Sequence, residues 1–342
     1  MNSEIILESR MSKRNLGKVL VTGTDGFIGS HLTELLVEQG FQTKALCIYN
    51  SDGSYGWLSE LVKKNPSNLT TALGDIRDPF QMEELCKDVD TVFHLAALIA
   101  IPYSYIAPQS YVSTNISGTL NLLQAAKKCG VSRFVHTSTS EVYGTALFVP
   151  ITEAHPVRGQ SPYSATKIGA DALVDSFWRS FSLPAVTLRP FNTFGPRQSY
   201  RAVIPTVIGQ VLSGATQIQL GSVHPTRDFN YVTNTAEAFI ALGEADNSVL
   251  GETFNAGSGR EITVGDMVKL VCKITGSHVD ISEDPNRMRP EKSEVERLLA
   301  DSSKLTKATG WLPKVSLEEG LSKTIEWQRN HRDFSNAHNY HR

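Results

Sequence analysis

The sequence predicts an α/β protein in which a doubly wound parallel sheet is joined to a smaller, mixed α/β C-terminal lobe. Three observations support this prediction. Short apolar segments alternate with longer amphipathic ones in the first half, a glycine-rich turn follows the first apolar segment, and prolines interrupt the segments after about residue 190. Continuous apolar strands that alternate with helices are typical of a parallel sheet covered on both faces.

The elements of the first half follow from their patterning. Short apolar runs predict strands, and longer runs with one apolar face predict helices. The predicted strands span 18–22, 42–48, 69–73, 91–95, 133–137 and 185–189. The predicted helices span 29–39, 80–87, 111–129 and 161–181.

The turn after the first strand has the sequence VLVTGTDGFIGSHL, in which Gly23, Gly26 and Gly29 have the spacing GxxGxxG. Glycine permits a tight turn and lets backbone N–H groups approach a pyrophosphate at the start of a helix. A glycine triplet at this first strand-to-helix junction indicates a dinucleotide site. We expect Phe27 and Ile28, within the same turn, to contact the cofactor as well.

Later strand ends add candidate cofactor contacts. Asp75 and Ile76 follow the third strand and are expected beside the adenine, and Ala96 and Ala97 follow the fourth strand, where small side chains let the cofactor lie close. The second strand ends near Asn50, which we expect to contact the cofactor, but it lacks the acidic residue that commonly holds the ribose of NAD and an arginine for NADP. The choice between NAD and NADP therefore stays open, with NAD slightly favoured.

The second half contains shorter elements, with helices predicted over 203–213, 233–245, 263–275 and 316–330. No low-complexity linker separates the halves, so we expect two lobes that pack tightly and share a cleft. The expected domains are a loose N-terminal lead-in over 1–17, a dinucleotide-binding domain with the core strands and catalytic residues over 18–190, a mainly substrate-binding lobe over 191–330, and a polar tail over 331–342.

Composition indicates a small-molecule partner. The 33 basic and 35 acidic residues nearly cancel, which favours neither a nucleic acid nor a membrane partner. Cys47, Cys86, Cys129 and Cys272 form no CxxC pair, so we expect free thiols, a cytoplasmic location and no zinc site. No stretch predicts a signal peptide or a membrane span. The three histidines after residue 330 predict a frayed polar end, and we expect no metal.

Tyr163 and Lys167 lie four residues apart in a predicted helix, so both project from one face. A phenol with a pKa near ~10 is a poor base at neutral pH, but a neighbouring ammonium lowers that pKa. The pair is then able to take a hydroxyl proton while a hydride leaves the same carbon. We expect both residues to be catalytic and to contact the cofactor.

The chain resembles the extended short-chain dehydrogenases/reductases that act on nucleotide sugars. The features that match span nearly the whole chain: Gly23, Gly26 and Gly29, Asp75–Ile76, His94–Ala97, Asn115, Ser138–Glu141, Tyr163 and Lys167, RPFNTFGPR at 189–197 and RDFNYV at 227–232. The resemblance implies a Rossmann domain and a nucleotide-sugar substrate.

The same resemblance implies the substrate contacts. Asn192 would contact the substrate, and Arg227 would hold its diphosphate, since a guanidinium fork suits that anion. Arg197, Arg201 and Arg289 are further candidates for the same anion.

Members of this group usually form homodimers in which two long helices of each subunit build a four-helix bundle. Segments 111–129 and 161–181 are the candidates, because their apolar residues exceed what one core face needs. These residues are Leu120, Leu122, Leu123, Leu173, Val174 and Phe177. The simpler interpretation is that they cover the sheet.

The segment HTSTSEVYGT, residues 136–145, ends the fifth strand at the sheet edge where ligands bind. The resemblance implies that Thr139 bonds the sugar O4 and that Glu141 makes the enzyme a 4,6-dehydratase. In such enzymes C4 is oxidised, a Glu at this position removes the C5 proton, water leaves C6 and hydride returns to C6. Ser140 stands where dTDP-glucose dehydratases have an acidic Asp. We therefore expect Glu141 to pass the C5 proton to the C6 oxygen, while Ser140 orients the group or relays the proton.

Within this group the chain is most similar to the N-acetylglucosamine 4,6-dehydratases of legionaminic acid biosynthesis, through STSEVYGTA, RPFNTFGPRQS and RPEKSEVERL. That similarity implies a GDP- or UDP-linked N-acetylglucosamine. Three alternatives stay open. A UDP-glucuronate decarboxylase shares the Thr-Ser-Glu stretch, a 4-epimerase is disfavoured by Glu141, and a non-catalytic dinucleotide sensor is disfavoured by Tyr163 and Lys167.

Overall fold

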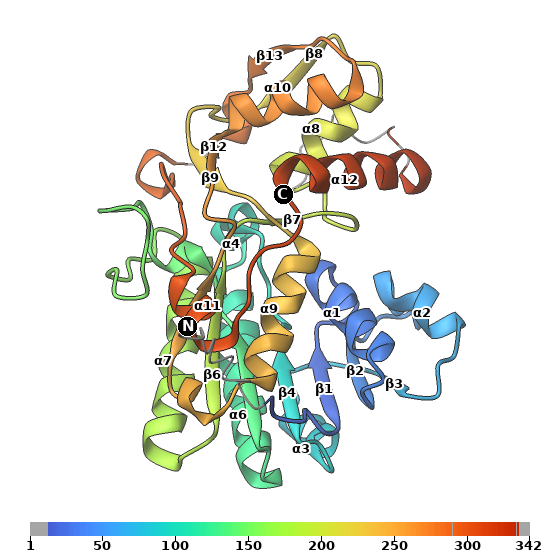
Figure 1. Ribbon diagram of the computed structural model, residues 1–342, viewed down its shortest axis with the longest axis vertical. Coiled ribbons are helices and arrows are strands. Elements are labelled where there is room, and N and C mark those ends of the chain that lie inside the picture. The colour runs from blue at the N-terminus through green and yellow to red at the C-terminus, as the bar shows by residue number, and fades with distance from the viewer. Residues whose placement is uncertain (1–12, 289, 333, 335–342) are drawn as a thin grey trace, which may run out of the picture.

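The computed structural model describes residues 13–288, 290–332 and 334. A seven-stranded sheet with the order β11-β6-β5-β4-β1-β2-β3 forms its centre, and every neighbouring pair in it is parallel (Figure 1). Its strands are β1 (Val19–Thr22), β2 (Thr43–Ile48), β3 (Leu69–Gly74), β4 (Thr91–His94), β5 (Arg133–Thr137), β6 (Ala185–Pro190) and β11 (Thr253–Ala256). The predicted doubly wound parallel sheet is confirmed.

Helices cover both faces of this sheet. They are α1 (Phe27–Glu38), α3 (Pro79–Cys86), α6 (Gly118–Cys129), α7 (Pro162–Phe181), α9 (Val232–Glu244) and α11 (Ser303–Thr309). Shorter helices are α2 (Ser59–Lys63), α4 (Ile101–Ile106) and α5 (Pro108–Tyr111), and a π-helical segment over Val112–Ser117 leads into α6. The predicted helix at 111–129 is therefore interrupted by a wider turn at its start.

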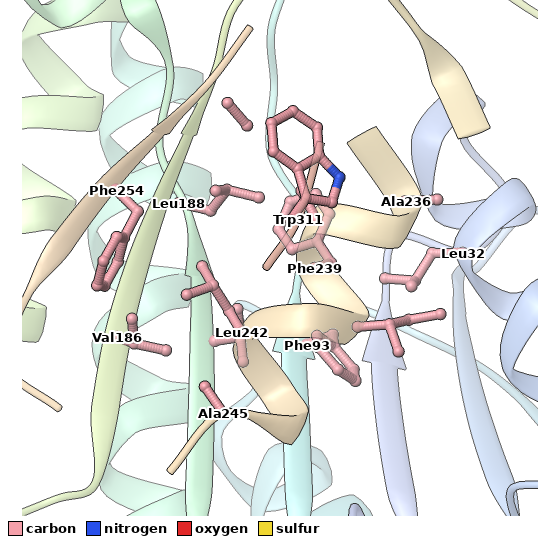
Figure 2. Packing of buried hydrophobic residues seen from close by; sticks show 14 of the residues in the cluster. Leu32, Phe93, Val186, Leu188, Ala236, Phe239, Leu242, Ala245, Phe254 and Trp311 are labelled. Carbon is pink, nitrogen blue, oxygen red and sulfur yellow. The ribbon is translucent and has the colours of Figure 1, made fainter. Parts of the chain in front are cut away.

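Alternating strand residues supply the two cores. Val19 and Val21 of β1 pack with Leu32 of α1 on one face, whereas Leu20 packs with Leu122 of α6 on the other. Successive side chains of a strand point to opposite faces, so a short apolar strand serves both layers. Figure 2 shows the first of these cores, where Phe239 of α9 lies over the sheet.

The sheet receives an edge strand that the sequence analysis did not foresee. After the chain leaves the sheet at β6, α9 packs against α1 and β5, and β11 then pairs with β6. The predicted domain boundary at residue 190 therefore marks where the chain first leaves the sheet. The segment 232–256 then returns to the sheet through α9 and β11. Trp311, labelled in Figure 2, and Leu305 of α11 belong to the same core.

The second lobe sits above the carboxyl ends of the strands (Figure 1). Its elements are β7 (Thr193–Phe194), α8 (Val203–Leu212), β8 (Gln217–Leu220), β9 (Thr226–Asp228), β10 (Asn230–Tyr231), β12 (Glu261–Thr263), α10 (Val264–Thr275), β13 (Asp280–Glu283) and α12 (Leu317–His331). Strand β8 pairs with β13 and β9 with β12. A separate core that includes Val211, Ile218, Val268 and Leu321 holds the helices and strands of this lobe together.

The leucine-rich helices α6 and α7 mainly serve the core of their own subunit. Leu122, Leu123, Val174 and Phe177 are all buried in the second core, and the other two candidate dimer residues pack against it. The structure therefore favours the simpler interpretation of these side chains, that they cover the sheet. The homodimer stays a prediction.

The ends of the described chain are better packed than expected. Within the predicted loose lead-in, Leu16 is fully buried, and the Arg14 amide donates to the Glu244 carbonyl at 2.7 Å. Residues 13–17 thus belong to the core because their apolar side chain fills a gap beside α9. Most of the predicted polar tail lies outside the described residues, including His338 and His341.

Candidate active site

A cavity of about 1060 Å³ lies between the sheet edge and the second lobe. Both lobes contribute to its walls, as the predicted shared cleft requires. The predicted site residues that line it are Gly23, Gly26, Phe27, Ile28, Gly29, Asp75, Ile76, Ala96, Ala97, Thr139, Ser140, Glu141, Tyr163, Lys167, Asn192, Arg197, Arg201 and Arg227. Arg289 lies outside the described residues.

The glycine turn forms one end of the cavity and fits a dinucleotide. Gly23 has φ +75°, and a Cβ there would lie 2.8 Å from the Ala96 amide. A Cβ at Gly29 would lie 2.1 Å from the Gly23 carbonyl oxygen. Side chains are thus excluded where α1 begins, and this leaves the backbone N–H groups open to the pyrophosphate of NAD(P).

Asn50 is the predicted cofactor residue that does not line the cavity. Its side-chain nitrogen donates to the carbonyls of Ile48 and Ser54, and its oxygen accepts from the Ser54 amide at 2.9 Å. These bonds close the loop that follows β2. Asn50 therefore shapes this loop instead of facing the cofactor, because an Asn after a strand readily bonds its own turn.

Strand β5 brings the segment HTSTSE to the cavity. Thr139 has extended backbone and begins a 3-10 turn over Ser140–Val142, in which its hydroxyl accepts from the Glu141 amide at 3.2 Å. The turn places Ser140 and Glu141 in the cavity wall, where Ser140 is buried and Glu141 half-buried. The polar end of β5 is therefore part of the site.

Helix α7 presents Tyr163 and Lys167 to the same wall. A capping box between Ser161 and Ser164 fixes its first turn. Tyr163 and Lys167 are 7% and 4% exposed. The Lys167 ammonium donates to the Thr137 carbonyl at 2.5 Å, and burial lowers the pKa of Lys167 to about 8.

The phenol of Tyr163 differs from expectation. Burial raises the pKa of Tyr163 well above its ordinary value, a hydrogen bond with Thr139 opposes that rise, and the negative charge of Glu141 adds to it. Lys167 is not among the groups that lower the pKa of this phenol, so the expected lowering by its ammonium is wrong. Because both groups act on this pKa, the Thr139 hydroxyl and the Glu141 carboxylate lie near the phenol.

A buried polar network behind Lys167 was missed by the sequence analysis. Asp171 accepts from the Ser138 hydroxyl at 2.7 Å and from the Arg189 guanidinium at 3.0 Å, and it lies 3.3 Å from the His136 ring. Although burial raises the pKa of Asp171, the hydrogen bonds and the neighbouring positive groups lower it overall. Its spacing four residues after Lys167 was the available signal, since both then share a helix face.

The second lobe supplies polar groups to the same cavity. The side-chain oxygen of Asn192 is buried and has no hydrogen-bond partner among the described residues, as expected of a group that meets a ligand. Arg227 is buried and pairs with Glu294 at 3.1 Å. Arg197 bonds Glu34 of α1 at 2.7 Å, which ties this lobe to the dinucleotide side of the cavity.

Comparison with known proteins assigns this architecture to a family. The family described as GDP-mannose 4,6 dehydratase matches residues 20–324. This chain belongs to that family. Its members include enzymes of the sugar-nucleotide dehydratase type, and the chain is an enzyme of this kind that uses NAD(P).

Individual relatives align with this chain over nearly its whole length. The low-salt glycan biosynthesis protein Agl12 of Haloferax volcanii is 34% identical over 320 residues, covering 90% of this chain and 97% of that protein. DesIV, a dTDP-glucose 4,6-dehydratase of Streptomyces venezuelae solved with NAD bound, has a TM-score of 0.82 and 28% identity over 92% of this chain and 98% of its own. The UDP-N-acetylglucosamine 4-epimerase of Methanobrevibacter ruminantium has a TM-score of 0.83 and 32% identity over 93% of this chain and 100% of its own.

Two solved relatives hold nucleotide sugars: the Methanobrevibacter epimerase contains UDP-N-acetylmuramic acid, and a UDP-glucuronic acid 4-epimerase of Bacillus cereus contains UDP-4-deoxy-4-fluoro-glucuronic acid and NAD. Across the described residues, no helix combines the length and the apolarity needed to cross a membrane.

The buried ammonium of Lys167 is expected to make stability depend on pH. Its folded-state pKa of about 8 lies below the ordinary 10.5, so the unfolded chain binds more protons between these pH values. The free energy of unfolding should therefore rise with pH, by roughly 1–2 kcal/mol from about pH 8 to about pH 9.5. Urea unfolding of wild type and Lys167→Met measures this rise, which the variant should lack. The exposed-site variant Lys64→Met should retain it, and an equal rise in Lys167→Met would contradict the assignment.

Proposed function

We propose that this enzyme is an NAD(P)-dependent 4,6-dehydratase that converts GDP- or UDP-N-acetylglucosamine to the 4-keto-6-deoxy sugar. The observation that supports this proposal is the position of Glu141, which lines the cavity and lies close enough to Tyr163 to raise the pKa of its phenol. Epimerisation at C4 needs only oxidation and re-reduction there, whereas elimination across C5–C6 needs a further base. A carboxylate beside the catalytic phenol supplies that base.

The first chemical step belongs to Tyr163 and Thr139. Thr139 orients the O4 hydroxyl, and Tyr163 takes its proton as the C4–H bond breaks. When bound, the oxidised cofactor accepts the hydride and brings a positive charge that lowers the pKa of the nearby phenol. Lys167, held on the Thr137 carbonyl, adds its charge to the same side.

The second step belongs to Glu141 and Ser140. The C4 ketone makes the C5 proton acidic, so the Glu141 carboxylate removes it and the C6–O bond breaks. The same proton then goes to the departing oxygen, either directly from Glu141 or through the Ser140 hydroxyl, and water leaves. As the hydride returns to C6, C5 takes up one proton, which balances the proton that Tyr163 took from O4, so the product is complete and the groups of the enzyme return to their starting state. Asn192, Arg197 and Arg227 are proposed to hold the nucleotide-sugar from the second lobe, as the buried, unpartnered oxygen of Asn192 suggests.

The test is incubation of the purified enzyme with GDP-N-acetylglucosamine, UDP-N-acetylglucosamine and UDP-glucuronate, followed by mass spectrometry. We expect one N-acetylglucosamine nucleotide to lose a single water and form a 4-keto product that reacts with a hydrazine. Loss of carbon dioxide from UDP-glucuronate alone would identify a decarboxylase and contradict the proposal. The similarity to legionaminic acid enzymes supports the acetamido sugar as the preferred substrate.

A 4-epimerase is the second candidate, because a UDP-N-acetylglucosamine 4-epimerase shares the fold at a TM-score of 0.83. An epimerase would yield a product of unchanged mass with an inverted C4. Chromatographic separation of the two epimers in the same reactions therefore distinguishes this candidate from the dehydratase. Glu141 has no role in such a reaction.

A further inference from the structure

The adenosine end of the cavity lacks the acid that commonly ends the second strand in NAD-binding sheets. Strand β2 ends at Ile48, and the loop after it offers Tyr49, which is 69% exposed, and Asn50, which bonds its own loop. An acid at this point usually accepts hydrogen bonds from the adenosine ribose and repels the 2′-phosphate of NADP. Tyr49 and Asn50, which follow β2, therefore do not supply the acid that would bind the ribose.

A carboxylate from another part of the chain occupies this position in space. Asp25 lies in the glycine turn, between Gly23 and Gly26, and its Oδ1 accepts from the Ile48 amide at 3.1 Å. Asp25 lines the cavity together with Ile48. A residue from the turn after β1 is thus bonded to the last residue of β2.

We propose that Asp25 replaces the missing β2 acid, holds the adenosine ribose hydroxyls of NAD and excludes the 2′-phosphate of NADP. This inference rests on the family's NAD(P) cofactor and does not depend on the sugar reaction. The bond to Ile48 uses one carboxylate oxygen. Among the described residues, the backbone amide of Asp25 itself also bonds this carboxylate, and a carboxylate has acceptor capacity beyond these two bonds for a ribose hydroxyl.

The loop after β2 holds Asp25 in place. The Trp57 amide donates to the Asp25 carbonyl at 3.2 Å. Gly56 has φ +55°, and a Cβ there would lie 2.7 Å from the same carbonyl oxygen. Only glycine lets the loop approach Asp25 so closely, so the loop fixes the backbone of Asp25 while the Ile48 amide holds its carboxylate.

Arg77 also lines the cavity and is a cation that would otherwise attract a 2′-phosphate. Its Nε lies 3.0 and 2.9 Å from the two carboxylate oxygens of Asp75, so the guanidinium is already paired. The charges of Arg77 and Asp75 offset each other. The carboxylate of Asp25 then leaves a net negative charge, which disfavours the binding of a dianionic phosphate.

The experiment is isothermal titration calorimetry of NAD⁺ and NADP⁺ against the protein freed of copurified nucleotide, without any sugar. We expect wild type to bind NAD⁺ at least about ten-fold more tightly than NADP⁺. Asp25→Asn keeps an oxygen for the Ile48 amide but loses the charge, so its preference should fall by about ten-fold, mainly through weaker NAD⁺ binding.

Asp52→Asn is the matched control, since Asp52 is an exposed carboxylate of the same loop that does not line the cavity. It should leave the NAD⁺/NADP⁺ ratio unchanged. Equal or tighter NADP⁺ binding by wild type would overturn the inference, and so would an unchanged ratio in folded Asp25→Asn. The wild-type ratio decides the matter even if the variant does not fold. A failure of the dehydratase assay would leave these binding constants unaffected.

Discussion

Replacing Glu141 with Gln is expected to lower the rate of product formation by about 10³-fold, the usual size of a general-base contribution. The amide has nearly the shape of the carboxylate but is unable to accept the C5 proton. Oxidation at C4 depends on Tyr163 and Thr139, so it should still occur. The variant should therefore accumulate reduced cofactor, visible as absorbance near 340 nm, while mass spectrometry finds almost no loss of water.

The control for this variant is Glu296→Gln, which changes an exposed carboxylate away from the cavity. It should turn over like wild type. If Glu141→Gln formed the dehydrated product at a rate near that of wild type, Glu141 would not be the base. If it formed neither product nor reduced cofactor, the carboxylate would instead be needed for the first step, and the proposed division of roles would be wrong.

The sequence predicted the parts of the fold that depend on local pattern. The strands before residue 190 and the four predicted helices after it lie within one residue of their predicted bounds, because apolar periodicity directly reflects burial. Strand β11 was missed because it has only four residues and includes the polar Asn255. The structure explains that residue, whose side chain bonds the Tyr143 hydroxyl at 2.7 Å and the Ile151 carbonyl at 3.0 Å.

The site was predictable where chemistry follows sequence spacing and not where it follows spatial contact. Tyr163 and Lys167 share a helix face, so their proximity needed no fold. Asp25 and Ile48 are brought together only by the pairing of β1 with β2 and by the loop that closes on the glycine turn. The pKa of Tyr163 was also misjudged, since spacing reveals a neighbouring ammonium but not the depth of burial.

Replacing Tyr163 with Phe is expected to stop the reaction one step earlier, with the overall rate lower by about 10³-fold or more because the C4 hydroxyl loses its proton acceptor. Unlike Glu141→Gln, this variant should produce neither reduced cofactor nor dehydrated product. The ring itself should stay in place, since Tyr163 packs edge-on against Tyr111 at 6.3 Å between centroids and phenylalanine preserves that contact.

Substrate binding distinguishes a chemical role for Tyr163 from a structural one. The dissociation constant of the nucleotide-sugar, measured by calorimetry, should change by no more than about three-fold in Tyr163→Phe, because only one neutral hydrogen bond is lost. Tyr49→Phe, at an exposed tyrosine outside the cavity wall, is the matched control and should retain full activity. Retention of reduced-cofactor formation in Tyr163→Phe would mean that another group takes the O4 proton. Thr139 would then be the first residue to test, because its hydroxyl bonds the phenol and both residues line the same cavity.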